Sequence, residues 1–196
     1  MSNNAGPPAG RPRDWDAEAV RARLGELARQ DPEYTRFGSE EHRYRLTPPL
    51  REATVRDFEE RYAVRLPGSY RTFLTRVGGS GAGPHYGLLP LDAPLPVDSD
   101  DAVDDLREQD RRPGFLAASF PLSAEWRGNP GERFHEEAER ARVAGSLVIA
   151  EAGCGEFVRL VVTGSSAGQI WFDDMTWDHL RPGPGFRDWY LSWLLH

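Results

Sequence analysis

The chain has 196 residues, a formal net charge of −7 and 39% hydrophobic residues. This length is typical of one domain with a tail, and no apolar run approaches the ~20 residues that a membrane-spanning helix needs. The acidic balance argues against general affinity for nucleic acid, whose phosphates would repel it. It fits either a charge that merely keeps the protein soluble or association with a basic protein partner.

The chain has one cysteine, Cys154, so it cannot form an internal disulfide, and no cysteine–histidine spacing resembles a zinc site. Residues 1–13 consist mostly of Gly, Pro, Asn and Arg with almost nothing to bury, and we expect them to be disordered. They also lack the apolar centre of a signal peptide. These features together predict a cytosolic protein.

Helices are predicted in the first third of the chain. Asp14 is expected to cap a helix that begins at Trp15 and ends before Pro32, because apolar residues recur at helical spacing between them. The stretch 47–67 predicts a second helix, with Thr47 as its N-cap and prolines in its first turn.

The middle of the chain alternates helical and irregular patterns. A third helix is predicted from about Gly68 to Val77, and the glycines 78–79 are expected to stop it in φ > 0 conformations. The segments "HYGLLPL" and "FLAASFPL" favour short strands. Between them, "DSDDAVDDLREQD" fits a short acidic helix or a solvated loop, and "RGNPGERFHEEAERARVAG" fits a short helix or a mobile excursion.

The last third is the clearest β region. The runs "SLVIAE", "FVRLVVTG" and "QIWFDD" are β-branched or aromatic, and "AGCGE" and "SSAG" between them have hairpin length. The closing "FRDWYLSWLL" is an amphipathic helix pattern. Helices, then a meander of strands, then a helix predict an α+β fold with an antiparallel sheet.

Cys154 raises the question of thiol catalysis, because it lies between two glycines beside an apolar run. A nucleophilic thiol needs a base within hydrogen-bond reach and a group that lowers its pKa. None of the five histidines lies in a recognisable nucleophile motif. We therefore interpret Cys154 as a small residue in a tight turn and predict no catalytic residues.

Two other motifs are candidate ligand sites. The loop "GGSGAG" follows a helix, opens none, and lacks the Lys-Ser/Thr that phosphate-binding loops carry, so a connector is favoured. Asp173, Asp174 and Asp178 lie close together in "WFDDMTWD", but no further ligands follow at calcium-loop positions. No metal site and no cofactor are predicted.

Acidic and aromatic residues in polar segments are the candidates for partner contact. Exposed tryptophan is enriched at binding hot spots, and clustered aspartates repel one another until a basic partner neutralises them. The candidates are Asp98, Asp100, Asp101, Asp104, Asp105, Trp126, Asp173, Asp174 and Trp177.

The stretch "FEERYAVRLPGSYRTFLTRVGGSGAGPHYGLLPL", with "FPLSAEW", "GSLVIAEAGCGEFVRLVVTGSSAGQIWFDD" and "FRDWYLSWL", resembles the SUKH superfamily of Smi/Knr-type proteins. The resemblance covers roughly residues 47–196. One departure is Val77, where many members carry Asn before the paired glycines. The helix at 14–30 and the polar stretch 127–145 lie outside the resemblance.

The resemblance implies an α+β fold with helices around a mixed, largely antiparallel sheet. It divides the chain into a tail (1–13), an N-terminal helical extension (14–46) and a SUKH-like domain (47–196). Bacterial members resemble immunity proteins, which bind a cognate polymorphic toxin, often a nuclease, and need a shaped, charged surface rather than catalytic residues. The alternative is an intracellular adaptor related to the fungal cell-wall regulators. In either case the expected partner is a protein, with neither nucleic acid nor membrane.

Overall fold

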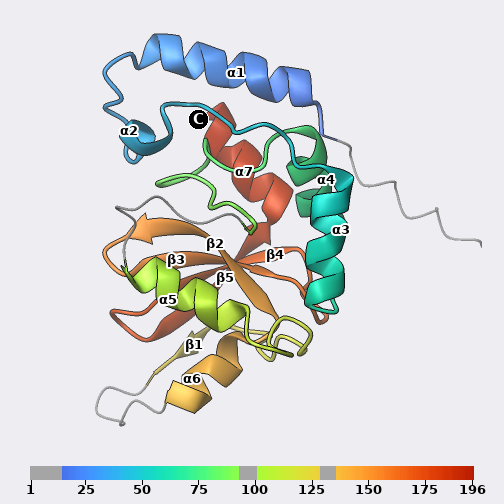
Figure 1. The fold of residues 1–196 in the computed structure, drawn as a ribbon. Helices are drawn as coiled ribbons and strands as arrows, with labels where there is room; N and C mark the ends of the chain where they lie inside the picture. Colours follow the sequence, from blue (N-terminus) through green and yellow to red (C-terminus); the bar gives the residue numbers. More distant parts are fainter. Residues whose placement is uncertain (1–14, 93–100, 129–135) are drawn as a thin grey trace, which may run out of the picture.

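A computed structural model describes residues 15–92, 101–128 and 136–196 of the chain, shown in Figure 1. Its sheet is antiparallel at every strand pair and has the order β1–β5–β4–β3–β2. The strands are β1 (Trp126–Arg127), β2 (Ser146–Gly153), β3 (Glu156–Val161), β4 (Gln169–Asp174) and β5 (His179–Gly185). The helices are α1 (Ala17–Gln30), α2 (Ser39–His42), α3 (Glu52–Arg61), α4 (Gly68–Arg76), α5 (Asp101–Asp110), α6 (Glu136–Val143) and α7 (Phe186–Leu195).

The sheet lies between two groups of helices, with α1, α3, α4 and α7 on one side and α5 and α6 on the other (Figure 1). On the first side, Leu147 and Ile149 of β2 belong to the main apolar core together with Phe186 of α7. On the second side, Val148 packs with Val103 of α5. Because β2 is covered on both faces, its sequence is a continuous apolar run rather than an alternating one. These layers confirm the α+β class.

The segment before α1 is part of this core. Trp15 is 7% exposed, and its ring meets Phe73, Phe186 and Tyr190 edge-to-face at centroid distances of 5.0, 6.0 and 5.7 Å. Its indole Nε1 donates a hydrogen bond to the carbonyl of Ser69 at 2.8 Å. The first helix and its flank therefore contribute to the packing of residues 47–196, whereas the proposed division at residue 47 stays a prediction.

Several sequence predictions for the helices are confirmed, but their caps differ. The first helix is capped by Asp16, whose carboxylate accepts from the Ala19 N–H, and Asp14 lies outside the described residues. Thr47 caps nothing: α3 begins only at Glu52, and the Thr47 hydroxyl lies 3.4 Å from the Ser80 carbonyl. The prolines keep residues 47–51 extended, because the residue before a proline avoids the helical region.

The paired glycines after α4 are required for space rather than for φ > 0. Neither Gly78 nor Gly79 has positive φ, which corrects the prediction. A Cβ on Gly78 would lie 2.9 Å from the Leu46 Cβ, and one on Gly79 would lie 2.9 Å from the Leu50 Cδ2. Residues 46–50 pass so close to Gly78 and Gly79 that neither position has room for a side chain.

The strand predictions were right for β2, β3 and β4 and wrong elsewhere. The segment 85–91 forms only isolated bridges through Leu88. The segment 115–122 contains no strand, and its Phe120 N–H donates to the carbonyl of Thr163, which lies beyond the end of β3. Conversely, β5 was missed because "HLRPGPG" contains two prolines. Its partner β1 pairs with only two of its residues, so most of β5 is a sheet edge that tolerates proline.

The predicted disorder of residues 1–13 lies outside the described part of the chain. In the two polar segments whose sequence fits either a helix or an irregular structure, the described residues include the helices α5 and α6.

Replacing Trp15 with Ala should destabilise the whole fold by about 3–5 kcal/mol, because the substitution empties an aromatic cluster in the core. Chemical denaturation followed by circular dichroism measures this. Leu195→Ala, at a residue that is 63% exposed, serves as the control and should change stability by less than about 0.5 kcal/mol. A loss confined to the N-terminal helix, with the sheet unaffected, would show that residues 15–46 are an independent appendage.

Candidate functional site

The predicted acidic segment begins with residues that lie outside the described chain. Asp98 and Asp100 fall in the undescribed segment 93–100, and Asp101 is the first residue of α5. Asp104 and Asp105 are exposed on α5, while Val103 and Leu106 of the same helix are buried against the sheet. The described aspartates 104 and 105 therefore lie on the outer surface of a helix docked against β2.

Asp173 lies below the surface. It is 9% exposed, and its carboxylate lies 2.6 Å from the Nε of Arg159, a residue with no exposed surface at all. The same guanidinium donates through Nη1 to Asp110 of α5 at 2.9 Å, and Asp110 also accepts from the Val148 N–H at 2.6 Å. Asp173 thus joins β4 to β3 in a buried ion-pair network, and its place in a partner contact remains only a prediction.

The two candidate tryptophans differ in exposure. Trp126 belongs to β1 and is half-buried beneath the guanidinium of Arg142, which lies 3.8 Å from the ring centroid and is also paired with Asp178. Trp177 is 78% exposed, in the turn between β4 and β5. The Asp174 carboxylate accepts from the Thr176 and Trp177 N–H groups at 3.1 Å and so fixes that turn.

The β4–β5 turn lies directly against the β2–β3 turn. The Met175 N–H donates to the Gly155 carbonyl at 3.0 Å, and the Thr176 hydroxyl donates to the Cys154 carbonyl at 3.0 Å. Cys154 is exposed with φ 53°, and Gly153 and Gly155 have φ 86° and 78°. Cys154 is therefore a turn residue, as predicted, on a surface made of both hairpin ends.

Sequence reasoning missed the aromatic residues on the other side of the β2–β3 turn. The Phe37 ring is 63% exposed and lies 5.1 Å from the Tyr86 ring and 6.4 Å from the His85 ring. A Cβ on Gly153 would lie 3.2 Å from the Tyr86 hydroxyl and 3.5 Å from the Phe37 Cζ. We call Phe37, His85 and Tyr86 the aromatic patch.

A carboxylate at the end of α1 positions Phe37. Asp31 accepts hydrogen bonds from the Tyr44 hydroxyl at 2.6 Å and from the Thr35 N–H and hydroxyl at 2.7 and 2.8 Å. It also accepts from the Arg36 N–H at 3.2 Å. These bonds, that of Tyr44 foremost, hold the pKa of Asp31 well below its usual range. The ionised Asp31 thus orders the loop that presents Phe37.

A buried histidine anchors α2 beneath the patch. His42 is 6% exposed, its Nδ1 accepts from the Tyr44 N–H at 3.0 Å, and its ring meets Trp193 edge-to-face at 5.7 Å. Burial lowers the pKa of His42 from 6.5 to about 4. His42 is therefore neutral at pH 7 and part of the structural support.

Several acidic side chains lie near the patch. Burial raises the pKa of Tyr86, and the negative charges of Glu151, Glu40 and Glu41 raise it further. Burial lowers the pKa of His85, and the negative charge of Glu156, whose carboxylate pairs with Arg181, only partly opposes that shift. Aromatic rings with carboxylates nearby are chemically suited to a cationic ligand.

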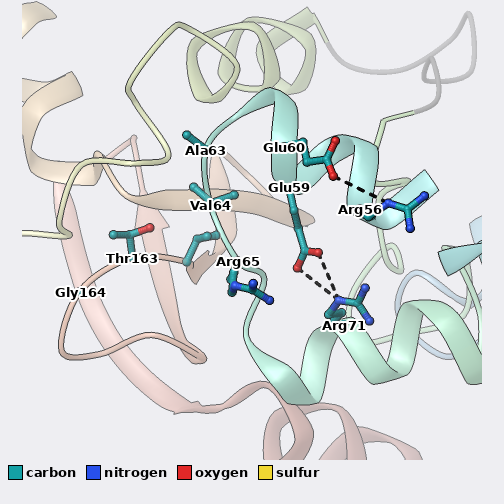
Figure 2. A pocket seen from close by; sticks show the side chains of 10 residues that line it. Arg56, Glu59, Glu60, Ala63, Val64, Arg65, Arg71, Thr163 and Gly164 are labelled. Carbon is teal, nitrogen blue, oxygen red and sulfur yellow. Dashed lines mark hydrogen bonds and ion pairs between the residues drawn. The ribbon is translucent and has the colours of Figure 1, made fainter. Parts of the chain in front are cut away.

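A broad depression in the described surface lies elsewhere, between α3, the following loop and the end of β3. It has a volume of about 700 Å³ (Figure 2). Its charged groups pair mainly with each other: Arg56 lies 3.8 Å from Glu60, and Arg71 lies 3.2 Å from Glu59. The carboxylates among its described lining residues, Glu59 and Glu60, both take part in these pairs.

Within the described residues, no group of three or more His, Cys, Asp or Glu side chains could hold a metal ion. The described helices include none that is long and apolar enough to cross a membrane. The large exposed aromatic side chains of the described chain are Phe37 in the aromatic patch and Trp177 in the β4–β5 turn.

The family model of the SMI1 / KNR4 family (SUKH-1) matches residues 49–191, well over half of the chain. The chain belongs to this family. No curated protein and no solved structure matches it. The SUKH-1 match includes the sheet, both hairpin turns and Tyr86, whereas Phe37 and the Asp31 network precede its first residue.

Replacing Asp110 with Ala should destabilise the fold by about 3–5 kcal/mol, because it leaves Arg159 buried beside a single carboxylate. Urea denaturation at pH 7 provides the measurement. Asp105→Ala on the exposed side of the same helix is the matched control, with an expected change below about 0.5 kcal/mol. Equal effects of the two substitutions would contradict a structural role for the Arg159 network.

Stability should fall as the pH drops from about 6.5 to 4. In this range the unfolded chain binds a proton on His42 and the folded chain does not, so acid favours unfolding by about 2 kcal/mol after solvent screening. Asp31 acts in the same direction at still lower pH, because its folded pKa is also lowered.

The free energy of unfolding, measured by urea titration at several pH values, tests this dependence. His42→Gln should flatten the slope between pH 6.5 and 4, whatever its effect on stability at pH 7. An unchanged slope in this variant would mean that other groups cause the dependence.

Proposed function

We propose that this protein is a non-catalytic immunity protein that binds a cognate polymorphic toxin in the cytosol and blocks it. Membership of the SUKH-1 family supports a binding domain of this kind. The observation that carries the proposal is the surface of the two hairpin turns, where Met175 and Trp177 are exposed at 47% and 78%. Large exposed apolar side chains on rigid turns are typical of protein contact sites.

The charge of the chain supports a basic toxin, with a nuclease as the proposed class. A net charge of −7 attracts a nuclease whose own surface is basic for nucleic acid. Contacts are proposed at the acidic segment Asp98–Asp105 and at Asp174 and Trp177. Trp126 is half-covered by Arg142 and Asp173 is held by Arg159, so both would act mainly by supporting their neighbours.

Inhibition by this protein requires no bond to be made or broken. Occupying the substrate surface of the toxin with carboxylates in place of phosphates is sufficient, and electrostatic steering makes capture fast. The exposed Cys154 thiol takes no part in this mechanism.

Expression of the chain should protect a susceptible host against the toxin domain encoded by a neighbouring gene, restoring growth that the toxin alone abolishes. Reversing the charge of Asp104, Asp105 and Asp174 together should weaken protection, because it turns attraction into repulsion. Growth curves and the dissociation constant of the purified pair are the two measurements.

Cys154→Ser is the control and should protect as well as the natural sequence. Loss of protection in Cys154→Ser with the fold intact would support the alternative that Cys154 is a catalytic nucleophile. Failure of the unaltered chain to protect, with stable binding to some other intracellular client, would contradict the proposal and favour a regulatory adaptor.

A further inference from the structure

We propose that the aromatic patch, Phe37, His85 and Tyr86, is a docking point for an arginine side chain of a basic protein partner. That this partner is a toxin rests on the proposed function, whereas the preference for arginine rests on the patch alone. The patch combines segments far apart in the sequence: the loop before α2, residues 85–86, and the β2–β3 turn on which they lie.

The rings present an open face. Phe37 and Tyr86 are tilted by 42° with centroids 5.1 Å apart, and Phe37 is 63% exposed. Burying such a ring against a partner removes apolar surface from water without requiring the core to move. In the described chain the other large exposed apolar side chains are Met175, Trp177 and Leu195, and the first two lie at the adjoining β4–β5 turn.

The backbone beneath the patch is fixed before any partner arrives. Gly38 has φ 73°, and a Cβ there would lie 2.0 Å from the His85 carbonyl oxygen, so the two loops are in direct contact. The Tyr86 N–H donates to the Glu151 carbonyl at 3.3 Å, which joins the second loop to β2. With the Asp31 network, these contacts lower the entropy that binding would otherwise cost.

The charge around the rings selects a cation. Glu40 and Glu41 are exposed on α2 beside the patch, and their side chains have no ion-pair partner among the residues that the structure describes. Glu151 adds a third negative charge close enough to raise the pKa of Tyr86. Nucleic acid would be repelled by the same carboxylates.

Among cations, the geometry favours a guanidinium. Arginine stacks on aromatic faces and donates a planar fork to carboxylates, whereas lysine offers a strongly hydrated point charge. Arginine–aromatic stacking occurs within this chain, which has no lysine: Arg142 lies 3.8 Å over Trp126 and Arg181 lies 4.8 Å over Phe172. No arginine of the described ranges lies over Phe37 or Tyr86, which leaves that position for a partner.

The test uses acetyl-Gly-Arg-Gly-amide as the probe, titrated into the ¹⁵N-labelled full chain and followed by amide chemical shifts. We expect saturable shifts confined to residues 37–41, 85–87 and 151–155. The lysine peptide should bind more weakly, and the citrulline peptide, which keeps the planar shape without the charge, should not bind. Phe37→Ala combined with Glu41→Gln should weaken arginine binding about tenfold.

Glu108→Gln, at an exposed acid of α5, is the matched charge control and should leave binding within about twofold, since screening isolates charges beyond ~10 Å. Shifts centred on α5 or on the Figure 2 depression, or equal binding of the arginine and lysine peptides, would overturn the inference. The inference is likewise overturned if the probe does not bind and the chain self-associates instead, with sedimentation showing the oligomer and amide shifts placing the contact at residues 37–41.

The same double variant separates this inference from the proposed function. If Phe37→Ala with Glu41→Gln binds the toxin domain as tightly as the natural chain, the patch is not the docking point and the immunity function stands. If the natural chain does not bind or block the toxin, the immunity function fails, and the arginine preference is decided by the peptide titration.

Discussion

The arrangement of the sheet and its outer helix depends on one buried cation. Arg159 has no exposed surface, and its guanidinium joins Asp110 of α5 to Asp173 of β4 from the middle of β3. Taking these charges out of water is costly, so the network favours only arrangements in which all three groups meet. It therefore fixes how α5 sits on the sheet, and with it the end of the sheet from which both hairpin turns project.

The β-branched pattern predicted β2, β3 and β4 because these strands are buried on both faces, where residue type and burial agree. The pattern gave no sign of β5, since proline is tolerated at an edge that only the finished sheet defines. Within "FVRLVV" the strand was predicted correctly, but the arginine in it was not recognised as a partner of Asp110. That pairing joins residues distant in the sequence and has no local signature.

Only the part of the candidate site that lies within a single turn could be predicted from the sequence. Trp177 is an exposed aromatic in a polar turn, and the sequence places it there without help from the fold. Asp173, two residues before that turn, looks the same in sequence and is buried, because strand alternation turns it toward Arg159. Phe37 and Tyr86 could not be paired from the sequence, because their segments meet only in the fold, where Gly153 of a third segment leaves room for both rings.

The aromatic patch lies at the boundary between what the family shares and what this chain adds. Tyr86 and the β2–β3 turn belong to the matched region 49–191, whereas Phe37 and the Asp31 network come before it. A core shared by many proteins can supply rigidity but not the choice of one partner, because that choice requires side chains that differ among relatives. In this protein the preceding segment is packed into the core through Trp15, and the Asp31 hydrogen bonds hold the loop that carries Phe37. Rigid support for a side chain outside the shared core is what a specific binding surface requires.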